Sequence, residues 1–573
     1  MTLVRPVREP IAAAGVALLV ACAYLPSLRN GFVYDDHEVI VVQPRPAGVA
    51  DLARVFGEPH FRGLPYYRPI VRASLLAQKA VHGDAPALFH LGNAVLAGAA
   101  AAAAYLLLRA PALAISAPFA FAAAACFALH PVASSAVLPI ASGRETLMPA
   151  LFALASTAAW LRARRGLAAL LFAAALGSKE QSAVLPFLFV AADALGLARE
   201  APPLRLRAAR AWTRRYAAVV AVALAYVAVR GSVLGGTAVE WAIDEAPLAP
   251  LGSLLFGAQV ALAPFAQLHY EPDPSVWASP VRVAAAAAAL AALAVFAVRS
   301  GAPSPRAALF WIVWFVATQL PTANVFRQEA PFDERYAFLA LLAFPAVAAA
   351  SASAAATSPA RRRAALAVAT ALAVLLAATT LGRMPSFRDD AAFAAQWLRT
   401  NPRAPEAHHL LAVVAMQEGR LDDAVTHHRD ALAGASGSPD LHVNLAVALA
   451  ETGRSDEARR ELERALALDP GHPEAHSALG ALLARSGRLE AAVEHHRAAL
   501  RAAPRMAAAH NNLGSALARL GRRQEAEAAL REAVRLAPGA ADARANLALL
   551  LRETGRREEA EAVLRGSPRS GDP

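Results

Sequence analysis

The feature that most constrains the fold is an alternation of apolar runs and short polar loops that extends from Pro10 to Leu381. An apolar run of about 20 residues can cross the hydrocarbon core of a bilayer as one helix. The chain is 57% hydrophobic over 573 residues, which is typical of a membrane protein and too long for one ordinary domain. We predict eleven membrane-spanning helices, and a twelfth run, at 250–268, is ambiguous. The predicted spans are residues 10–28, 88–108, 112–129, 146–161, 167–177, 182–197, 216–230, 281–298, 307–320, 336–352 and 364–381.

Arginine placement predicts the orientation of these helices. With the N-terminus in the cytoplasm, the inside loops hold seventeen Arg and only two acidic residues, Glu9 and Glu200. Cytoplasmic loops of membrane proteins are enriched in positive charge, so this asymmetry supports the eleven-helix topology. The asymmetry holds only if residues 250–268 do not cross, and we interpret that run as re-entrant or interfacial. The topology predicts a multi-pass inner-membrane protein whose region after residue 401 lies outside the cytoplasm.

Charge and cysteine content exclude several other classes of protein. The net charge of +11 resides in the first 400 residues, because the remainder is nearly neutral. Basic loops without any nucleic-acid motif indicate contact with a lipid bilayer, and we predict no nucleic-acid partner. Cys22 and Cys126 lie far apart in apolar runs, which argues against a disulfide framework or a cysteine metal site. The sequence LVAC, which ends at Cys22, also resembles a lipoprotein cleavage box, but the later spans favour a retained first helix.

The C-terminal region repeats with a period of 34 residues. A glycine recurs at this spacing, followed by arginine and, five positions after the glycine, by alanine. The glycines are Gly419, Gly453, Gly487, Gly521 and Gly555. This pattern is the signature of tetratricopeptide repeats, which stack into an α-solenoid with a concave binding surface. We therefore predict an all-α chain: a polytopic domain at 1–385, a linker at 386–401, four full repeats and an irregular fifth at 402–566, and a disordered tail at 567–573.

Unusual polar residues fall on the outer side of the predicted topology. They are Asp35 and Asp36 in the first outer loop, His130, Arg144 and Glu145 in the second, Lys179, Glu180 and Gln181 in the third, and Asp333, Glu334 and Arg335 before a late helix. A charge within the membrane costs about 2.5–3.5 kcal/mol on the insertion scale, so a shared polar cavity would explain the clustering. Each cluster alone also has a structural interpretation, as a helix cap, a helix end or an interfacial ion pair.

These clusters, in this order, resemble a known family. The stretches NGFVYDDHEVI, YYRPIVRASLLAQKAVHG, LFHLGNAVL, HPVASSAVLPIASGRETLMPALFAL, SKEQSAVLPFLFVAADAL and DERYAFLALLAFP precede the repeats. Together they resemble the transmembrane and tetratricopeptide repeat-containing O-mannosyltransferases and their bacterial relatives, which look like GT-C glycosyltransferases. The similarity covers nearly the whole chain, and its weight comes from order and spacing because each motif is short.

The resemblance implies an enzyme that moves a sugar, mannose in that family, from a polyprenyl-phosphate carrier to an extracytoplasmic acceptor. It implies that Asp35 and Asp36 are the catalytic acidic pair. It also implies that Lys179, Glu180 and Arg335 lie near the carrier phosphate. The sequence departs from the family at DERY, where relatives often carry an Ala-Glu-Arg run, and in its small number of repeats.

The chemistry of the residues agrees with this implication. A hydroxyl acceptor is a weak nucleophile and needs a base within hydrogen-bond reach, a role that one carboxylate can fill, and we rank Asp36 above Asp35. The second carboxylate can orient the base or help to hold a divalent metal, although no metal-ligating residue is assigned. The leaving phosphate needs cations, which Lys179, Arg335 and Arg144 can supply.

Two polar columns recur in the repeats. Asn444, Asn512 and Asn546 are interpreted as groove residues that hydrogen-bond an extended polypeptide acceptor or a partner protein. A histidine column with the same period is interpreted as a packing position within helix pairs; its members are His408, His442, His476 and His510. Two alternatives stay open: a GT-C enzyme that modifies a lipid or an envelope glycan, and a non-enzymatic membrane scaffold whose repeats assemble other proteins.

Overall fold

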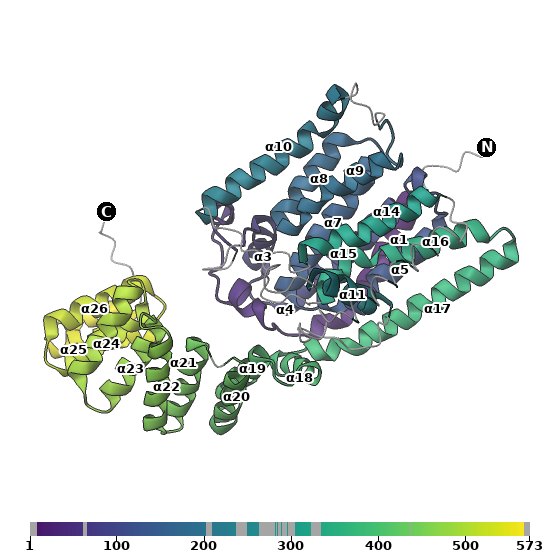
Figure 1. The fold of residues 1–573 in the computed structure, drawn as a ribbon. Coiled ribbons are helices and arrows are strands. Elements are labelled where there is room, and N and C mark those ends of the chain that lie inside the picture. The colour runs from purple at the N-terminus through teal and green to yellow at the C-terminus, as the bar shows by residue number, and fades with distance from the viewer. Residues whose placement is uncertain are drawn as a thin grey trace. The chain divides into compact units, whose positions relative to one another are not determined.

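The computed structural model describes residues 8–60, 66–201, 209–235, 249–262, 304–322, 334–435 and 437–565, with a few single residues between 281 and 295. Every regular element in this part of the chain is a helix, so the predicted all-α class is confirmed. The chain divides into two compact units, Met1–Asn401 and Pro402–Pro573 (Figure 1). The predicted tail at 567–573 lies outside the described residues.

The first unit is a helical bundle in which α4 packs against α1, α5 and α7, and α7 packs against α8. Its α-helices are α1 (Arg8–Ala23), α2 (Val49–Arg54), α3 (Pro69–His82), α4 (Pro86–Leu108), α5 (Ala117–Ala128), α6 (Val132–Val137), α7 (Ile140–Leu161), α8 (Arg165–Ser178), α9 (Leu185–Ala194), α10 (Ala209–Leu234), α11 (Ala249–Leu262), α14 (Pro305–Gln319), α15 (Phe338–Leu341), α16 (Ala343–Ala355), α17 (Pro359–Arg383) and α18 (Asp390–Thr400). Small residues allow the close packing: a Cβ atom on Gly98 of α4 would lie 2.5 Å from the carbonyl oxygen of Ala17 in α1.

Short helical turns connect these helices. They are η1 (Leu25–Arg29), η2 (His37–Val41, a π-helical turn), η3 (Val55–Gly57), η4 (Pro111–Leu113), η5 (Glu180–Val184), η7 (Leu320–Thr322), η8 (Glu334–Ala337) and η9 (Met384–Phe387). Three of them, η2, η5 and η8, carry or adjoin the polar clusters singled out in the sequence. The polar residues therefore lie at helix ends, where backbone groups are available to hold them.

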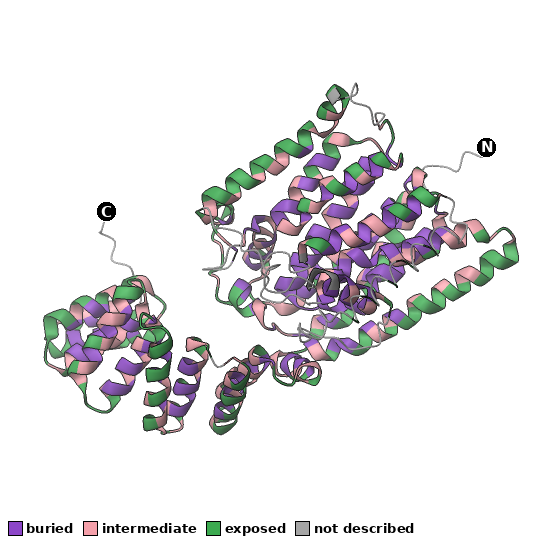
Figure 2. Ribbon diagram, in the orientation of Figure 1, coloured by how far each residue is buried: buried purple, intermediate pink, exposed green. Residues whose placement is uncertain are grey.

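Five helices of this unit are long and apolar enough to cross a membrane. They are Glu9–Arg29, Pro86–Leu108, Arg210–Leu234, Glu334–Ala355 and Pro359–Phe387. Helices α10 and α17 are exposed along much of their length (Figure 2), and their exposed side chains include Leu224, Val227, Val368 and Leu372. A long apolar surface of this kind is what the acyl chains of a bilayer would cover.

The predicted number of eleven spans is not confirmed. The predicted spans at 112–129 and 167–177 correspond to α5 and α8, which have 12 and 14 residues. Both are shorter than the ~20 residues that a perpendicular crossing needs. The predicted span at 281–298 and the end of the ambiguous run at 250–268 lie largely outside the described residues; α11 accounts for the part of that run up to Leu262.

The segment at 386–401, expected to be a linker, instead contains η9 and α18 and belongs to the first unit. Asp389 caps α18, because its carboxylate accepts a hydrogen bond of 2.8 Å from the Ala392 N–H. Phe393 and Trp397 lie one helical turn apart on the buried face of the helix. This apolar face packs α18 onto the bundle, so the segment is part of the folded unit.

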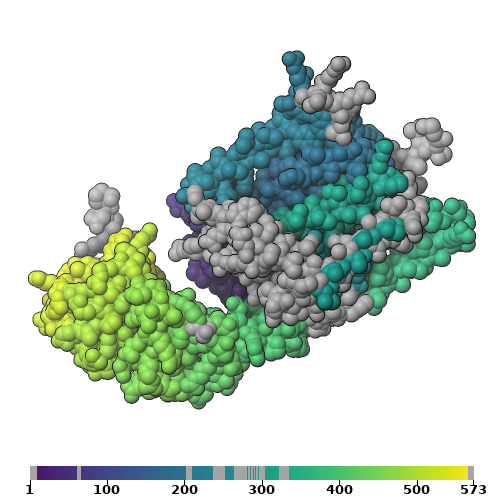
Figure 3. Space-filling model, in the orientation of Figure 1, coloured from purple at the N-terminus to yellow at the C-terminus, as the bar shows by residue number. Residues whose placement is uncertain are grey.

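The second unit contains five consecutive helix pairs. The helices are α19 (Pro405–Gln417), α20 (Leu421–Gly434), α21 (Pro439–Glu451), α22 (Ser455–Leu468), α23 (Pro473–Arg485), α24 (Leu489–Ala502), α25 (Ala507–Arg519), α26 (Arg523–Leu536), α27 (Ala541–Glu553) and α28 (Arg557–Arg565). Each glycine of the 34-residue period ends the first helix of a pair with a φ between 76° and 83°, a conformation that favours glycine. The pairs follow one another from green to yellow (Figure 3), and the last is the shortest.

Candidate functional site

The first polar loop is fixed to the start of α7 by Asp36. Its carboxylate accepts hydrogen bonds from the backbone N–H groups of Val33 (3.0 Å), Ile140 (3.3 Å) and Ala141 (2.6 Å), and it is fully buried. Ile140 and Ala141 are the first residues of α7, whose unpaired N–H groups attract an anion. Both carboxylate oxygens are thus occupied by backbone donors, so Asp36 is a structural anchor and does not fit a metal ligand. The ranking of Asp36 as the better base is contrary to this geometry.

Asp35 is placed differently, although it is the adjacent residue. It is only partly buried, and within the described residues no hydrogen bond or ion pair engages its carboxylate. Burial raises the pKa of Asp35 to about 7, and the positive charge of Arg335 opposes this rise while Glu145 adds to it. Both of these charged residues therefore lie close to Asp35. A carboxyl group with this pKa can accept a proton near neutral pH.

A buried ion network fixes the floor of the site. Arg68 donates to Glu145 (2.5 Å) and to Glu180 (2.9 Å), and His60 lies 2.6 Å from the second carboxylate oxygen of Glu145. Arg68 and Glu145 are both less than 10% exposed. Buried charges require such mutual pairing, and breaking one of the pairs would leave an uncompensated charge. The network therefore locks the positions of α7, of the segment before α3 and of η5 relative to each other.

A pocket of about 510 Å³ opens beside this network. Glu145 of α7, Lys179 after α8, and Arg335 and Tyr336 of η8 line it. The ammonium of Lys179 lies 5.1 Å from the centre of the Tyr336 ring, and the Arg335 guanidinium lies 5.7 Å from the same ring. Three segments that are far apart in the sequence thus bring two cations and an aromatic ring to one cavity.

Lys179 is the least neutralised of these groups. Its side chain is 6% exposed, and no carboxylate in the described part of the chain lies within ion-pair distance of its Nζ atom. Burial lowers the pKa of Lys179 to about 7, and the nearby positive charge of Arg68 adds to this effect. An anion in the pocket would restore the charged form, since it would provide the missing partner.

Two of the predicted phosphate-binding residues have other contacts. Arg144 points to α4, where its Nε donates to Asn93 Oδ1 at 3.1 Å and its Nη2 to the Phe89 carbonyl at 3.4 Å. It is not among the residues that line the pocket, which is contrary to the prediction. Glu180 does not line the pocket either, and its role is to hold Arg68.

The network also contains residues that the sequence did not single out as site residues. Arg68 stood only within the run YYRPIV, and His60 stood in an unremarkable loop. Glu145 was noted beside Arg144, but the prediction assigned the phosphate to the arginine. A single sequence pattern does not show which of two adjacent charges on a helix faces a cavity, because a step of one residue turns the side chain by about 100°.

Glu334 of the DERY motif has a structural role. Its carboxylate accepts a hydrogen bond from Ser135 and forms an ion pair with Arg383 of α17. Arg383 also donates to the Pro131 carbonyl oxygen at 2.8 Å. These contacts hold η8 against α6 and α17, and they place Arg335 and Tyr336 at the pocket. The predicted partner Asp333 lies outside the described residues.

The asparagine column lies on the first helices of the repeats. Consecutive first helices, such as α21 and α23, contact each other and form the inner layer of the array. Asn444, Asn512 and Asn546 are each partly exposed. Asn546 donates to Asn511 Oδ1 of the preceding repeat at 3.0 Å, so Asn511 joins the predicted column.

The histidine column lies inside helix pairs, as interpreted from the sequence, but its contacts are polar. Each of the first three members meets the residue 19 positions later on the second helix of its own pair. The pairs are His408 with His427 (3.4 Å), His442 with Glu461 (2.8 Å) and His476 with His495 (3.0 Å).

Comparison with known proteins identifies only the C-terminal class. Two family models, both described as tetratricopeptide repeat, match residues 415–482 and 520–572, and residues 386–439 and 492–541. The C-terminal region therefore carries tetratricopeptide repeats, as predicted, and such repeats generally mediate protein interactions. No curated protein matches the chain.

Several solved structures align with part of the chain. A crystal structure of MamA is 21% identical, with 27% of this chain and 91% of that chain covered and a TM-score of 0.24. MamA from Desulfovibrio magneticus RS-1 is 20% identical, with 28% and 91% covered and a TM-score of 0.25. The pilF protein of Pseudomonas aeruginosa is 22% identical, with 30% and 78% covered and a TM-score of 0.27.

Proposed function

We propose that the first unit is a membrane glycosyltransferase that moves a sugar from a polyprenyl-phosphate carrier to a hydroxyl group of an extracytoplasmic acceptor. The observation that carries this proposal is the buried ammonium of Lys179, which faces a pocket and has no carboxylate partner among the described residues. A buried unpaired cation is costly, and a phosphate group would neutralise it. The resemblance to the O-mannosyltransferases supports mannose as the sugar and a protein serine or threonine as the acceptor.

The pocket suits a donor that is anionic at one end and apolar at the other. Lys179 and Arg335 would hold the phosphate oxygens. Ala153, Leu185 and Phe338 line the same pocket and would contact the first isoprenoid units. Tyr336, which lies against both cations, offers a ring face on which a sugar can pack.

Asp35 is the proposed base. The acceptor oxygen forms a bond to the anomeric carbon while the bond between that carbon and the phosphate oxygen breaks, and Asp35 takes the acceptor proton. The electron pair of the broken bond stays on the phosphate, where Lys179 and Arg335 stabilise the charge. Attack from the side opposite the phosphate inverts the anomeric centre. Asp36 and Glu145 act by positioning, the first through the loop and the second through Arg68.

The repeats would present the acceptor. Asn444, Asn512 and Asn546 occupy one column of the inner layer and can hydrogen-bond the backbone of an extended polypeptide. In this proposal the N-terminus is cytoplasmic, and the pocket and the repeats are on the opposite side of the inner membrane.

Transfer by the purified full-length chain tests the proposal. The assay supplies polyprenyl-phosphate mannose and a serine- and threonine-rich peptide, and donor binding is measured separately. Lys179→Met should weaken donor binding and turnover, whereas Lys179→Arg keeps the charge and should retain more of both. Asp35→Asn should lower turnover by about a hundred- to ten-thousand-fold with donor binding retained.

Glu38→Gln is the matched control for Asp35→Asn, because Glu38 is an exposed acid in the same loop. It should transfer sugar at the normal rate. Normal transfer by folded Asp35→Asn and Lys179→Met proteins would reject the proposed site.

The repeats alone favour a second candidate function. Tetratricopeptide repeats are found in proteins that assemble other proteins, so a membrane-anchored scaffold accounts for the C-terminal unit without any chemistry. A scaffold would capture partners equally well with and without Lys179→Met and would not consume the donor lipid. A GT-C enzyme for lipids or envelope glycans would consume the donor only when that acceptor replaces the peptide.

A further inference from the structure

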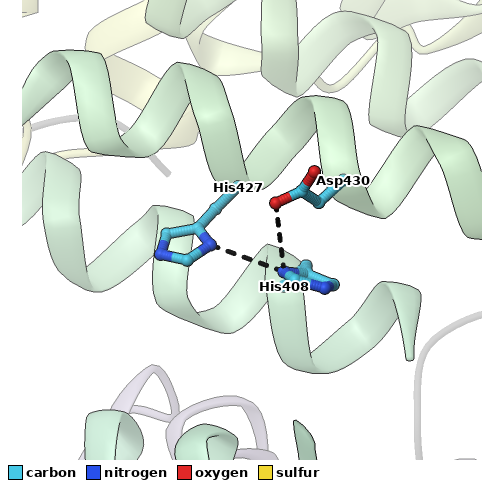
Figure 4. A group of neighbouring side chains, drawn as sticks. All are labelled: His408, His427 and Asp430. Atoms are coloured by element: carbon cyan, nitrogen blue, oxygen red, sulfur yellow. Dashed lines mark hydrogen bonds and ion pairs between the residues drawn. The ribbon is translucent and has the colours of Figure 1, made fainter. Parts of the chain in front are cut away.

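Three metal-ligand side chains converge within the first repeat. His408 lies on α19, and His427 and Asp430 lie one turn apart on α20 (Figure 4). The Nδ1 atoms of the two histidines are 3.4 Å apart, and Asp430 Oδ2 is 3.8 Å from His408 Nδ1. One donor atom from each residue lies within 4.8 Å of the other two. The cluster belongs to the second unit alone and does not depend on the proposed transferase.

The spacing of the donor atoms matches a coordination shell. Zinc binds imidazole nitrogen at about 2.0–2.1 Å in a tetrahedron, which separates two nitrogen ligands by about 3.4 Å. The two Nδ1 atoms have this separation before any metal is considered. The carboxylate oxygen needs to move by only about 0.4 Å toward His408 to complete a second edge of the tetrahedron.

A backbone contact orients His408 as a ligand. Its Nε2 lies 3.1 Å from the Pro402 carbonyl oxygen, which can only accept a hydrogen bond. The ring proton is therefore on Nε2, and the lone pair of Nδ1 points to His427. Metal-bound histidines are held in this way, with the second nitrogen donating to a carbonyl or a carboxylate. Burial and the adjacent His408 lower the pKa of His427, so its ring is neutral and available at neutral pH.

We propose that His408, His427 and Asp430 bind one divalent late transition-metal ion, with Zn²⁺ as the physiological class. Two imidazoles and a carboxylate are a ligand set typical of such ions, and three protein ligands leave the fourth position open. The Asp430 side chain is 52% exposed, so water or a group from a partner can reach that position. The ion would join α19 to α20 and stiffen the first repeat.

The other repeats provide an internal comparison. In the third repeat, His476 and His495 form the same pair, and His476 makes the same contact with the Pro470 carbonyl. The residue that corresponds to Asp430 is Ala498, so this repeat lacks the third ligand. In the second repeat His442 pairs with Glu461, and in the fourth Ala529 replaces the second histidine. The first repeat alone combines all three ligands within the described array.

The test uses full-length protein in detergent, stripped with a chelator and purified without a histidine tag. Titration with Co²⁺ should produce the visible absorption of a tetrahedral site at one ion per chain, and Zn²⁺ should displace it. Asp430→Asn should weaken Zn²⁺ binding at least about tenfold, and His427→Gln should weaken it about a hundredfold or more. His476→Gln, the matched control, should leave the site unchanged.

Ala498→Asp is the decisive variant. It adds the missing carboxylate beside the histidine pair of the third repeat, and the proposal expects the number of tight Co²⁺ sites to rise from one to two. A count that stays at one, or native Zn²⁺ affinity in folded His427→Gln protein, would overturn the assignment. Circular dichroism of each variant separates loss of ligands from loss of fold.

Discussion

Adjacent carboxylates at the first polar loop have different environments because the backbone turns sharply there. Tyr34 has a φ of 49°, which is uncommon for a non-glycine residue, and the π-helical turn η2 begins at His37. Between them, Asp36 turns toward α7 and Asp35 remains without a backbone donor. The sequence indicated the acidic pair, but the choice between its members depended on this local conformation, which no periodicity predicts.

The pH dependence of transfer should reveal both titrating groups. As pH rises through about 7, Asp35 loses its proton and becomes able to act as a base, so activity should increase. Over the same range free Lys179 loses its charge and its hold on the donor phosphate. The profile of kcat/KM should therefore be bell-shaped near pH 7, while kcat, measured on the donor complex, should show only the rising limb because bound phosphate keeps Lys179 charged.

Lys179→Arg provides the control for this profile, since arginine stays charged throughout the range. Its kcat/KM should rise with pH and then level off without a falling limb. A falling limb that persists in this variant would assign the second titration to another group.

Helix α18 shows how one element can position a site from a distance in the sequence. Asp390 accepts a hydrogen bond from the Tyr34 N–H at 2.8 Å and lies 2.9 Å from His37 Nε2, so it holds both sides of the acidic pair. The Tyr34 ring also packs against Phe393 and Trp397 of the same helix. The periodic apolar residues of α18 were visible in the sequence, but their position between the last apolar run and the repeats suggested a linker.

Asp390→Ala should therefore loosen the loop at residues 30–41. It removes two contacts, each worth about 0.5–1.5 kcal/mol, which should raise hydrogen exchange in the loop by at least several-fold and reduce transfer. Asp389→Ala is the matched control, because Asp389 caps the helix and does not touch the loop. Equal exchange in the two variants would contradict a specific role for Asp390.

At the scale of the whole molecule, the sequence predicted what depends on local periodicity. The helices and the 34-residue repeats follow from spacings of a few residues, and both are present in the structure. The ion network could not be predicted, because Arg68, Glu145 and Glu180 come from three segments whose association depends on the packing of the bundle. The number of membrane crossings also depends on that packing, since several apolar helices are short.

The orientation in the membrane can be measured with fusions to a reporter enzyme that is active only outside the cytoplasm. A fusion after Thr400 should be active, because the arginine distribution places the repeats outside. A fusion after Arg165, in a predicted inside loop, should be inactive. The reverse pattern would place the pocket on the cytoplasmic side, where an extracytoplasmic acceptor is absent.

The glycine turns of the repeats have a consequence for how such a chain can change. Each turn ends the first helix with nearly the same φ, so every repeat passes the chain to the next in the same register. Loss or duplication of 34 residues would then leave each remaining junction intact. Genetic gain or loss of whole repeats could lengthen or shorten the groove in discrete steps, like the marks of a ruler, while the membrane unit keeps its sequence. The span of acceptor that the array covers is therefore a property that recombination can tune separately from catalysis.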